Sequence, residues 1–207
     1  MNSYSKNNNK FYNLIKCITT SWIYFILTFG FNNYIGMLNN DIFRTFFTFV
    51  FCMFFSYWSH RLSHEKFPIL SNTYLHRLHH NVKYNKKWWA EIIEWIVNLI
   101  QIGGIILIPL NMIINRYIGI KIFNNYSIVF FSIIYSLTHM ISYHNLKVDT
   151  HINHHENMKN NYGPDFIDII FDTKKDNTIF EDHNPYIINT LISFVIVIFL
   201  MKKKILH

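Results

Sequence analysis

The sequence contains little charge and little cysteine for its length. Lys, Arg, Asp and Glu make up 15% of the 207 residues, whereas an average soluble protein carries about 25%. So few charged residues cannot cover a water-facing surface of this size, which argues against a soluble enzyme. The two cysteines, Cys17 and Cys52, both lie in apolar stretches, so we expect neither a disulfide framework nor a cysteine-based metal site.

Apolar and basic residues dominate what is present. Hydrophobic residues make up 51% of the chain and aromatic residues 18%, while the formal net charge is +7. Long apolar stretches separated by basic loops are typical of a multi-pass membrane protein whose positive loops stay in the cytoplasm. We therefore expect the membrane, and not a nucleic acid, to be the partner of the basic residues.

The apolar residues are gathered in five runs. The first four approach the thickness of a bilayer and predict an all-α integral membrane protein with about four transmembrane helices. The fifth run has 16 residues and ends in three lysines, so we expect it to lie in or dip into the cytoplasmic leaflet. The runs are Leu14–Leu38, Ile42–Trp58, Ile92–Ile114, Tyr126–Ser142 and Tyr186–Met201.

Two segments depart from a series of straight helices. Gly103, Gly104 and Pro109 lie inside the third run and predict a kinked helix or a broken, re-entrant pair. Residues 1–10 are polar and have no hydrophobic period, so they are predicted to form a disordered tail. Residues 11–207 are then a single membrane-embedded domain, with the basic segment 59–87 on the cytoplasmic side.

Eight of the twelve histidines lie in three short clusters. The first cluster has the spacing H-x3-H, and the other two share the spacing H-x2-H-H. A random distribution of histidines would not repeat this spacing. The clusters are His60 with His64, then His76, His79 and His80, and finally His151, His154 and His155.

This spacing is suited to binding metal ions. Residues three or four apart share one face of a helix, so His60 and His64 can bind the same ion. In each H-x2-H-H the first and third histidines share a face, while the middle one is turned by about 100° toward a neighbouring metal. The eight imidazoles can therefore bind two ions. Imidazole suits zinc, copper, iron and nickel, so the ligand type alone does not select iron.

Other ionisable residues are weaker candidates. His139 lies at the end of the fourth apolar run, and an ionisable residue at membrane depth is usually functional, so we expect it to be a further ligand. His144 is an additional candidate that shares an ion with His139 only if the helix ends between them. His183 and His207 fall outside this spacing and are expected on the surface. Three acidic residues beside the clusters could orient imidazoles: Glu65, Asp149 and Glu156.

The histidine segments resemble those of the fatty acid hydroxylase superfamily, also called the sterol desaturase family. The resemblance covers about residues 45–175, and His139 matches an extra histidine that many members carry upstream of the last cluster. The closing segment of the family, W-D-x-L-F-G-T, is matched with Ile167 in place of tryptophan and Asp172 in place of glycine. The matching segments are HRLSH at 60–64, HRLHH at 76–80, HINHH at 151–155, NYG at 161–163, and Asp168, Phe171 and Thr173.

The resemblance implies an integral membrane oxidoreductase, typically of the endoplasmic reticulum in eukaryotes, with its metal site on the cytoplasmic side. Such enzymes use two histidine-bound iron ions, which zinc can replace on isolation, and dioxygen to hydroxylate or desaturate a lipid held in the bilayer. Electrons come from a separate electron-transfer protein, because this chain has no glycine-rich nucleotide fingerprint and no room for a fused haem domain. The implied ligands are His60, His64, His76, His79, His80, His139, His151, His154 and His155.

Two other functions compete with this interpretation. An acyl-lipid desaturase of the separate membrane desaturase family also has three histidine clusters, but those chains are usually longer and lack the NYG segment. A non-enzymatic protein that transports or stores metal would place its ligands along transmembrane faces. Here nearly all the histidines lie in the polar segments between the apolar runs. We therefore expect a lipid hydroxylase or desaturase whose lipid class, fatty acid, sphingolipid or sterol, the sequence leaves open.

Overall fold

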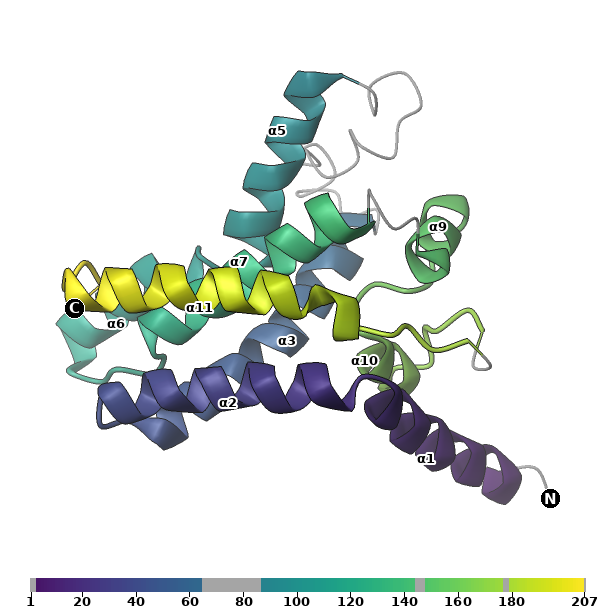
Figure 1. Cartoon of the computed structure of the whole chain (residues 1–207). Coiled ribbons are helices and arrows are strands. Elements are labelled where there is room, and N and C mark those ends of the chain that lie inside the picture. The colour runs from purple at the N-terminus through teal and green to yellow at the C-terminus, as the bar shows by residue number, and fades with distance from the viewer. Residues whose placement is uncertain (1–2, 65–86, 144–147, 177–178, 207) are drawn as a thin grey trace.

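The computed structural model describes residues 3–64, 87–143, 148–176 and 179–206. All the regular secondary structure in these residues is helical, and no strand occurs among them (Figure 1). The prediction of an all-α fold is therefore confirmed for the part of the chain that the structure describes.

Several helical segments are long and apolar enough to cross a membrane. Their outer faces expose large apolar side chains such as Phe43, which is 93% exposed. Such extensive apolar surface suits contact with lipid and not with water. The prediction of a multi-pass membrane protein is therefore supported. The four candidate spans are Ile42–His64, Trp88–Ile118, Asn125–Tyr143 and Asn184–Lys202, and the bent pair of Lys10–Thr20 with Trp22–Leu38 is a fifth.

The first apolar run is divided into two helices. Helix α1 (Ser3–Thr20) and helix α2 (Trp22–Leu38) meet at an angle of 75°. Helix α1 begins inside the segment that was predicted to be a disordered tail, and Lys10 Nζ donates to the carbonyl of Ile170, 2.7 Å away. The prediction of one continuous helix over the first apolar run was therefore wrong, because the run bends between α1 and α2.

Polar groups from a distant segment stabilise this bend. The N–H of Tyr24 donates to Asn184 Oδ1 at 3.0 Å, and Asn184 Nδ2 donates to the carbonyl of Thr20 at 3.1 Å. A break in an apolar helix leaves backbone groups without their intrahelical partners, and these groups need replacements where water is scarce. Asn184 provides replacements on both sides of the break, so the bend is a built feature of the fold.

A bundle of four helices forms the centre of the molecule. It consists of α2, α3 (Ile42–His64), α7 (Asn125–Leu137) and α11 (Ile187–Lys202), and α7 continues as a π-helical turn, η2 (Thr138–Tyr143). Each of these helices packs against at least two of the others. Apolar side chains from all four fill the space between them: Ile35, Phe49, Cys52, Phe130 and Val197.

The third apolar run is interrupted, as its glycines predicted. Helix α5 (Trp88–Val97) continues as a π-helical turn, η1 (Asn98–Ile102), before the break, and α6 (Leu107–Ile118) follows it. A side chain at Gly103 would place its Cβ 3.0 Å from Cα of Ser132, so only glycine allows α7 to pass this closely. The next residue, also a glycine, has a φ of +100°, which L-residues rarely adopt.

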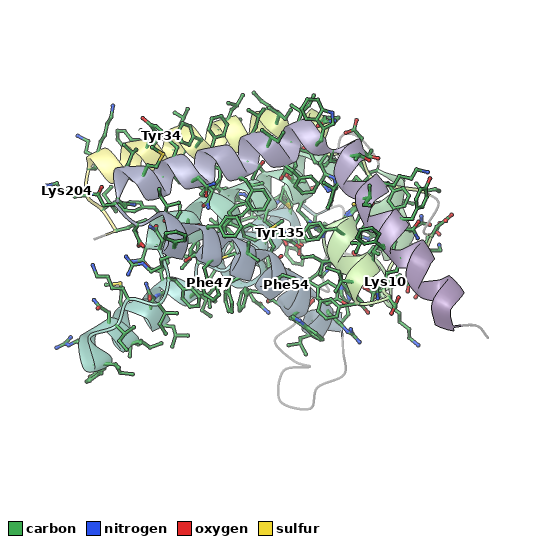
Figure 2. All side chains as sticks on the ribbon, turned by 90° about the horizontal axis from the view of Figure 1, so that it is seen from below. Lys10, Tyr34, Phe47, Phe54, Tyr135 and Lys204 are labelled. Atoms are coloured by element: carbon green, nitrogen blue, oxygen red, sulfur yellow. The ribbon has the colours of Figure 1, made fainter. Side chains whose placement is uncertain are left out.

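The final apolar run is a candidate span by its length and composition. The helical turn η3 (Asn184–Tyr186) extends it to 19 residues, which meets the length of a span. Asn189 of α11 is buried and donates to Thr138 Oγ1 at 3.2 Å and to Ser142 Oγ at 2.8 Å, which fixes α11 to η2. Figure 2 shows Lys204, just after α11, at the opposite end of the molecule from Lys10. The expectation that this run lies in or dips into the cytoplasmic leaflet stays a prediction.

Two short helices lie at the other end of the bundle, away from the carboxyl terminus. Helix α9 (Asp149–Glu156) and helix α10 (Asp165–Ile170) both follow the fourth span, and α10 packs against α1 (Figure 1). Helix α9 carries the third histidine cluster, while the first cluster is at the end of α3. The fold therefore brings together two clusters that are about 90 residues apart in the chain.

Candidate metal centre

Three histidines converge on one point. His60 and His64 come from the last turns of α3, and His154 comes from α9. One ring nitrogen from each lies within 4.8 Å of the other two, and the Nε2 atoms of His64 and His154 are 3.1 Å apart. Ligands that bind a zinc-sized ion at about 2.0–2.1 Å are separated by roughly 3.3 Å. The three imidazoles therefore fit a single transition-metal ion, as the spacing of His60 and His64 predicted.

Backbone carbonyls determine which ring nitrogens face this point. His60 Nδ1 donates to the carbonyl of Tyr162 at 2.6 Å, and His154 Nδ1 donates to the carbonyl of Asn160 at 2.7 Å. A carbonyl can only accept, so each Nδ1 carries the proton and each Nε2 presents a lone pair. Such hydrogen bonds are the usual means of orienting metal-binding histidines.

A second group of histidines lies beside the first. The Nε2 atoms of His151 and His155 are 3.0 Å apart, and the ring of His139 lies 4.8 Å from that of His151 between centroids. His60 and His139 are 6.3 Å apart by the same measure, so the two groups are neighbours. The first and third histidines of this H-x2-H-H therefore share a face, and the middle one turns to the other group, as the helical geometry predicted.

The remaining predicted ligands cannot be placed in this way. His76, His79, His80 and His144 lie outside the described residues. Six of the nine histidines predicted as ligands are therefore described, and all six lie in the two groups. These are His60, His64, His139, His151, His154 and His155.

The turn that carries the orienting carbonyls is held by Asp168. Its carboxylate accepts from the N–H of Tyr162 and of Gly163, both at 3.0 Å, and from the hydroxyl of Thr173 at 2.6 Å. Burial raises the pKa of Asp168 from 3.8 to about 7, although these three hydrogen bonds lower it. Asp172, where the family usually has glycine, has a φ of +56°, which aspartate tolerates better than most residues.

Two of the expectations for other polar residues were wrong. His183, expected on the surface, is buried, and its N–H and its ring both contact the hydroxyl of Ser21 at the bend between α1 and α2. Glu156, a candidate for orienting an imidazole, is exposed and pairs with Lys175. Glu65 and the side chain of Asp149 lie outside the part of the chain that the structure describes.

Sequence reasoning missed two buried carboxylates near the histidines. Glu94 of α5 lies 3.4 Å from the ring of His139, measured from Oε1 to Nε2. Glu181 accepts from the hydroxyl of Tyr186 at 2.8 Å and of Tyr143 at 3.4 Å. Glu94 had a recognisable signal, because it is an acidic residue inside an otherwise apolar run. Glu181 had none, because it lies in a polar segment.

A pocket lies next to the histidines. The residues that line it include His60, His139 and His151 from the two histidine groups. Most of the remaining lining is apolar and comes from α2, α3 and α7, the helices of the central bundle. The apolar lining includes Phe25, Phe29, Phe49, Met53, Phe131 and Ile134.

The sequence was compared with protein families, curated proteins and solved structures. A family model described as "Fatty acid hydroxylase" matches residues 45–173. No curated protein and no solved structure matches the chain. The matched segment is more than half of the chain and contains all six described histidines of the two groups. The chain therefore belongs to the fatty acid hydroxylase family.

Proposed function

We propose that this protein is a membrane-bound oxidoreductase that uses dioxygen and two histidine-held iron ions to hydroxylate or desaturate a lipid. The observation that carries the proposal is the apolar pocket, whose wall includes histidines of both groups. Membership of the fatty acid hydroxylase family supports the same class of reaction. Zinc can take the place of iron on isolation, because imidazole binds both.

The donor atoms of the site fit such ions. His60 and His154 each direct a lone pair of Nε2 toward the point that His64 also faces. When bound, the iron ions would supply the oxidising chemistry that no protein side chain provides for an unactivated C–H bond. His139, His151 and His155 are the described candidates for holding the second ion.

The chain itself would position the lipid and exclude water. The aromatic and aliphatic side chains of α2, α3 and α7 suit an acyl chain or another apolar body, and the histidines lie beside them. A substrate could therefore remain largely in the bilayer while one of its carbons reaches the metal centre. Electrons would come from a separate electron-transfer protein, and the site would face the cytoplasm.

The two competing functions are less well supported. A desaturase of the separate membrane desaturase family would not explain the match to the fatty acid hydroxylase family over residues 45–173. A metal transporter would need ligands along the helices. The six described histidines instead gather where α3 and η2 end, together with the short helix α9.

The test compares lipids from cells that express the wild type with lipids from cells that express His154→Ala. Extracts are analysed by mass spectrometry for species that have gained one oxygen or lost two hydrogens. We expect such a product with the wild type and none with the variant, at equal amounts of membrane-inserted protein. No difference in any lipid class, in a host with a matched electron donor, would contradict the proposed function.

A further inference from the structure

A second cavity lies at the end of the bundle where α11 finishes, at the opposite end from α9 (Figure 1). Its volume is about 640 Å³, which is in the range of sites for small ligands. The headgroups of membrane lipids lie at the level where spans begin and end. Residues close to one end of each of the four candidate spans line the cavity: Arg44, Arg116, Asn125 and Leu206.

Three cations line this cavity, but only one of them has an acidic partner. Arg44 binds the carboxylate of Asp41 and donates from Nη1 to the carbonyl of Lys121 at 3.0 Å. Arg116 of α6 and Lys121, in the segment after α6, are both exposed. Neither of them pairs with an acid in the part of the chain that the structure describes. The cavity therefore carries positive charge that these residues do not neutralise.

A buried amide donor adds to the polar part of the wall. Asn39, directly after α2, lines the cavity, and its Nδ2 atom is buried without an acceptor among the described residues. A buried donor without an acceptor is costly, so such groups usually have a partner. An oxygen atom of a ligand would provide one. Exposed cations together with this donor fit an anion that carries several acceptor oxygens, such as a phosphate group.

The apolar part of the wall favours a lipid as the source of the phosphate. Met112, Ile113 and Arg116 lie on one face of α6, at spacings of three and four residues. Met112 and Ile113 are 56% and 55% exposed and lie inside the candidate span Trp88–Ile118. One face of α6 therefore has an apolar surface at membrane depth and a cation near its end. A free phosphate ion would use only the cation, whereas a phospholipid would use both.

We propose that this cavity binds the phosphate group of an anionic membrane lipid. Arg116 and Lys121 are the charged contacts, and Nδ2 of Asn39 donates to a phosphate oxygen. Arg44 has a different role, because its contacts with Asp41 and with the carbonyl of Lys121 hold the wall in place. The proposal does not depend on the metal centre, which lies at the other end of the bundle.

A lipid at this position would also attach α6 to the bundle. Among the described elements, α6 packs mainly against α7. The lining of the cavity comes from α3, α6 and α7 and from the residue after α2. A ligand that contacts all of these segments would hold them together. Because it would bind the folded protein and not the unfolded chain, it should raise the midpoint of thermal unfolding.

The test measures the binding of lipid by the full-length protein in a neutral detergent. The wild type is titrated separately with dioctanoyl phosphatidylglycerol, with dioctanoylglycerol, which lacks the phosphate, and with inorganic phosphate. Calorimetry measures the affinity, and thermal unfolding measures the midpoint. We expect the phospholipid to raise the midpoint and to bind about tenfold or more tightly than either of the other probes.

Two double variants separate this site from general surface charge. Arg116→Gln with Lys121→Gln should bind the phospholipid about tenfold or more weakly than the wild type, because both charged contacts are lost. Lys202→Gln with Lys204→Gln is the matched control. It removes the same charge from exposed residues at the same end of the molecule but outside the wall of the cavity (Figure 2). The control should bind the phospholipid within about twofold of the wild type.

Three other results would overturn the proposal. Equal weakening in both double variants would mean that the lipid is attracted by surface charge in general. Equal binding of inorganic phosphate would make a free anion the ligand, and equal binding of dioctanoylglycerol would show that the phosphate is not recognised. If the first double variant is unstable, Asn39→Asp replaces it, because a carboxylate there repels phosphate; unchanged binding by Asn39→Asp would overturn the proposal. None of these results bears on the metal centre, so the proposed function is tested separately.

Discussion

The two ends of the helical bundle bury polar side chains in different ways. At the end near α6, Asn111 accepts from the N–H of Ile122 and of Phe123, both at 3.1 Å, and donates to the carbonyl of Phe123 and to Asn125 Oδ1. At the other end, imidazole nitrogens face one another, at 3.1 Å for His64 with His154. Both ends are polar and shielded, but only the second gathers lone pairs around a common point.

This difference indicates which buried polar residues are structural. The amide of Asn111 uses donors and acceptors in complementary pairs, so the chain itself satisfies it. His154 donates its Nδ1 proton to a carbonyl and directs the lone pair of Nε2 at two other imidazoles. Converging lone pairs are stable only with a positive partner or a donated proton between them. The histidine end is therefore the candidate metal-binding end of the bundle.

The largest effect is expected from His154→Ala. This variant removes an imidazole from the first group and leaves the carbonyl of Asn160 without its donor. We expect the loss of at least one metal ion per chain and the complete loss of lipid oxidation. Elemental analysis of gently purified protein, with no chelator present, measures the metal. Asn111→Ala at the other end is the matched control, and equal metal loss in both variants would refute the distinction between the two ends.

A smaller effect is expected from Asp168→Ala. This variant removes no ligand, but it releases the N–H groups of Tyr162 and Gly163 and the hydroxyl of Thr173. The turn should then hold the orienting carbonyls of Asn160 and Tyr162 less firmly. We expect the metal affinity to fall by about 10–100-fold, as measured by competition with a coloured chelator. Asp172→Asn is the control, because Asp172 is exposed and asparagine also tolerates its φ of +56°.

Much of the site could be predicted because local periodicity determines it. The pairing of His151 with His155, and the separate direction of His154, follow from helical geometry alone, and the structure has both. The break after η1 follows from two adjacent glycines. In each case the information lies within a few residues of the feature that it predicts.

The remaining features depend on contacts between distant segments. The bend between α1 and α2 requires Asn184, which is about 160 residues away along the chain. His183 is buried for the same reason, because Ser21 at the bend contacts it. Glu94 is close to His139 only because α5 packs beside η2. No periodicity within one segment contains this information, so the sequence predicted neither the bend nor these partners.

Asn111→Ala should affect stability without affecting the metal. The variant leaves the N–H groups of Ile122 and Phe123 without their acceptor in a shielded environment. We expect the free energy of unfolding to fall by about 1–3 kcal/mol, as measured by denaturation in detergent micelles. Asn115→Ala, one turn later on α6 and less buried, is the matched control. A loss of metal in Asn111→Ala would show that the two ends are coupled.

The smallest effect concerns pH. Because burial raises the pKa of Asp168 from 3.8 to about 7, the folded protein holds a proton there that the unfolded chain releases. The stability that this proton provides is fully present below pH 3.8 and is lost as the pH rises through about 7. Asp168→Asn cannot titrate, so it should lack this part of the pH dependence.

The test measures the midpoint temperature of thermal unfolding from pH 4 to pH 8. It compares metal-free wild type with metal-free Asp168→Asn at each pH. Histidine titration affects both proteins alike, so it cancels in the difference. We expect the midpoint of the wild type to fall relative to that of the variant by on the order of a few degrees as the pH rises. A relative rise would mean that the hydrogen bonds from Tyr162, Gly163 and Thr173 outweigh burial. In that case Asp168 would hold the turn as a charged carboxylate throughout.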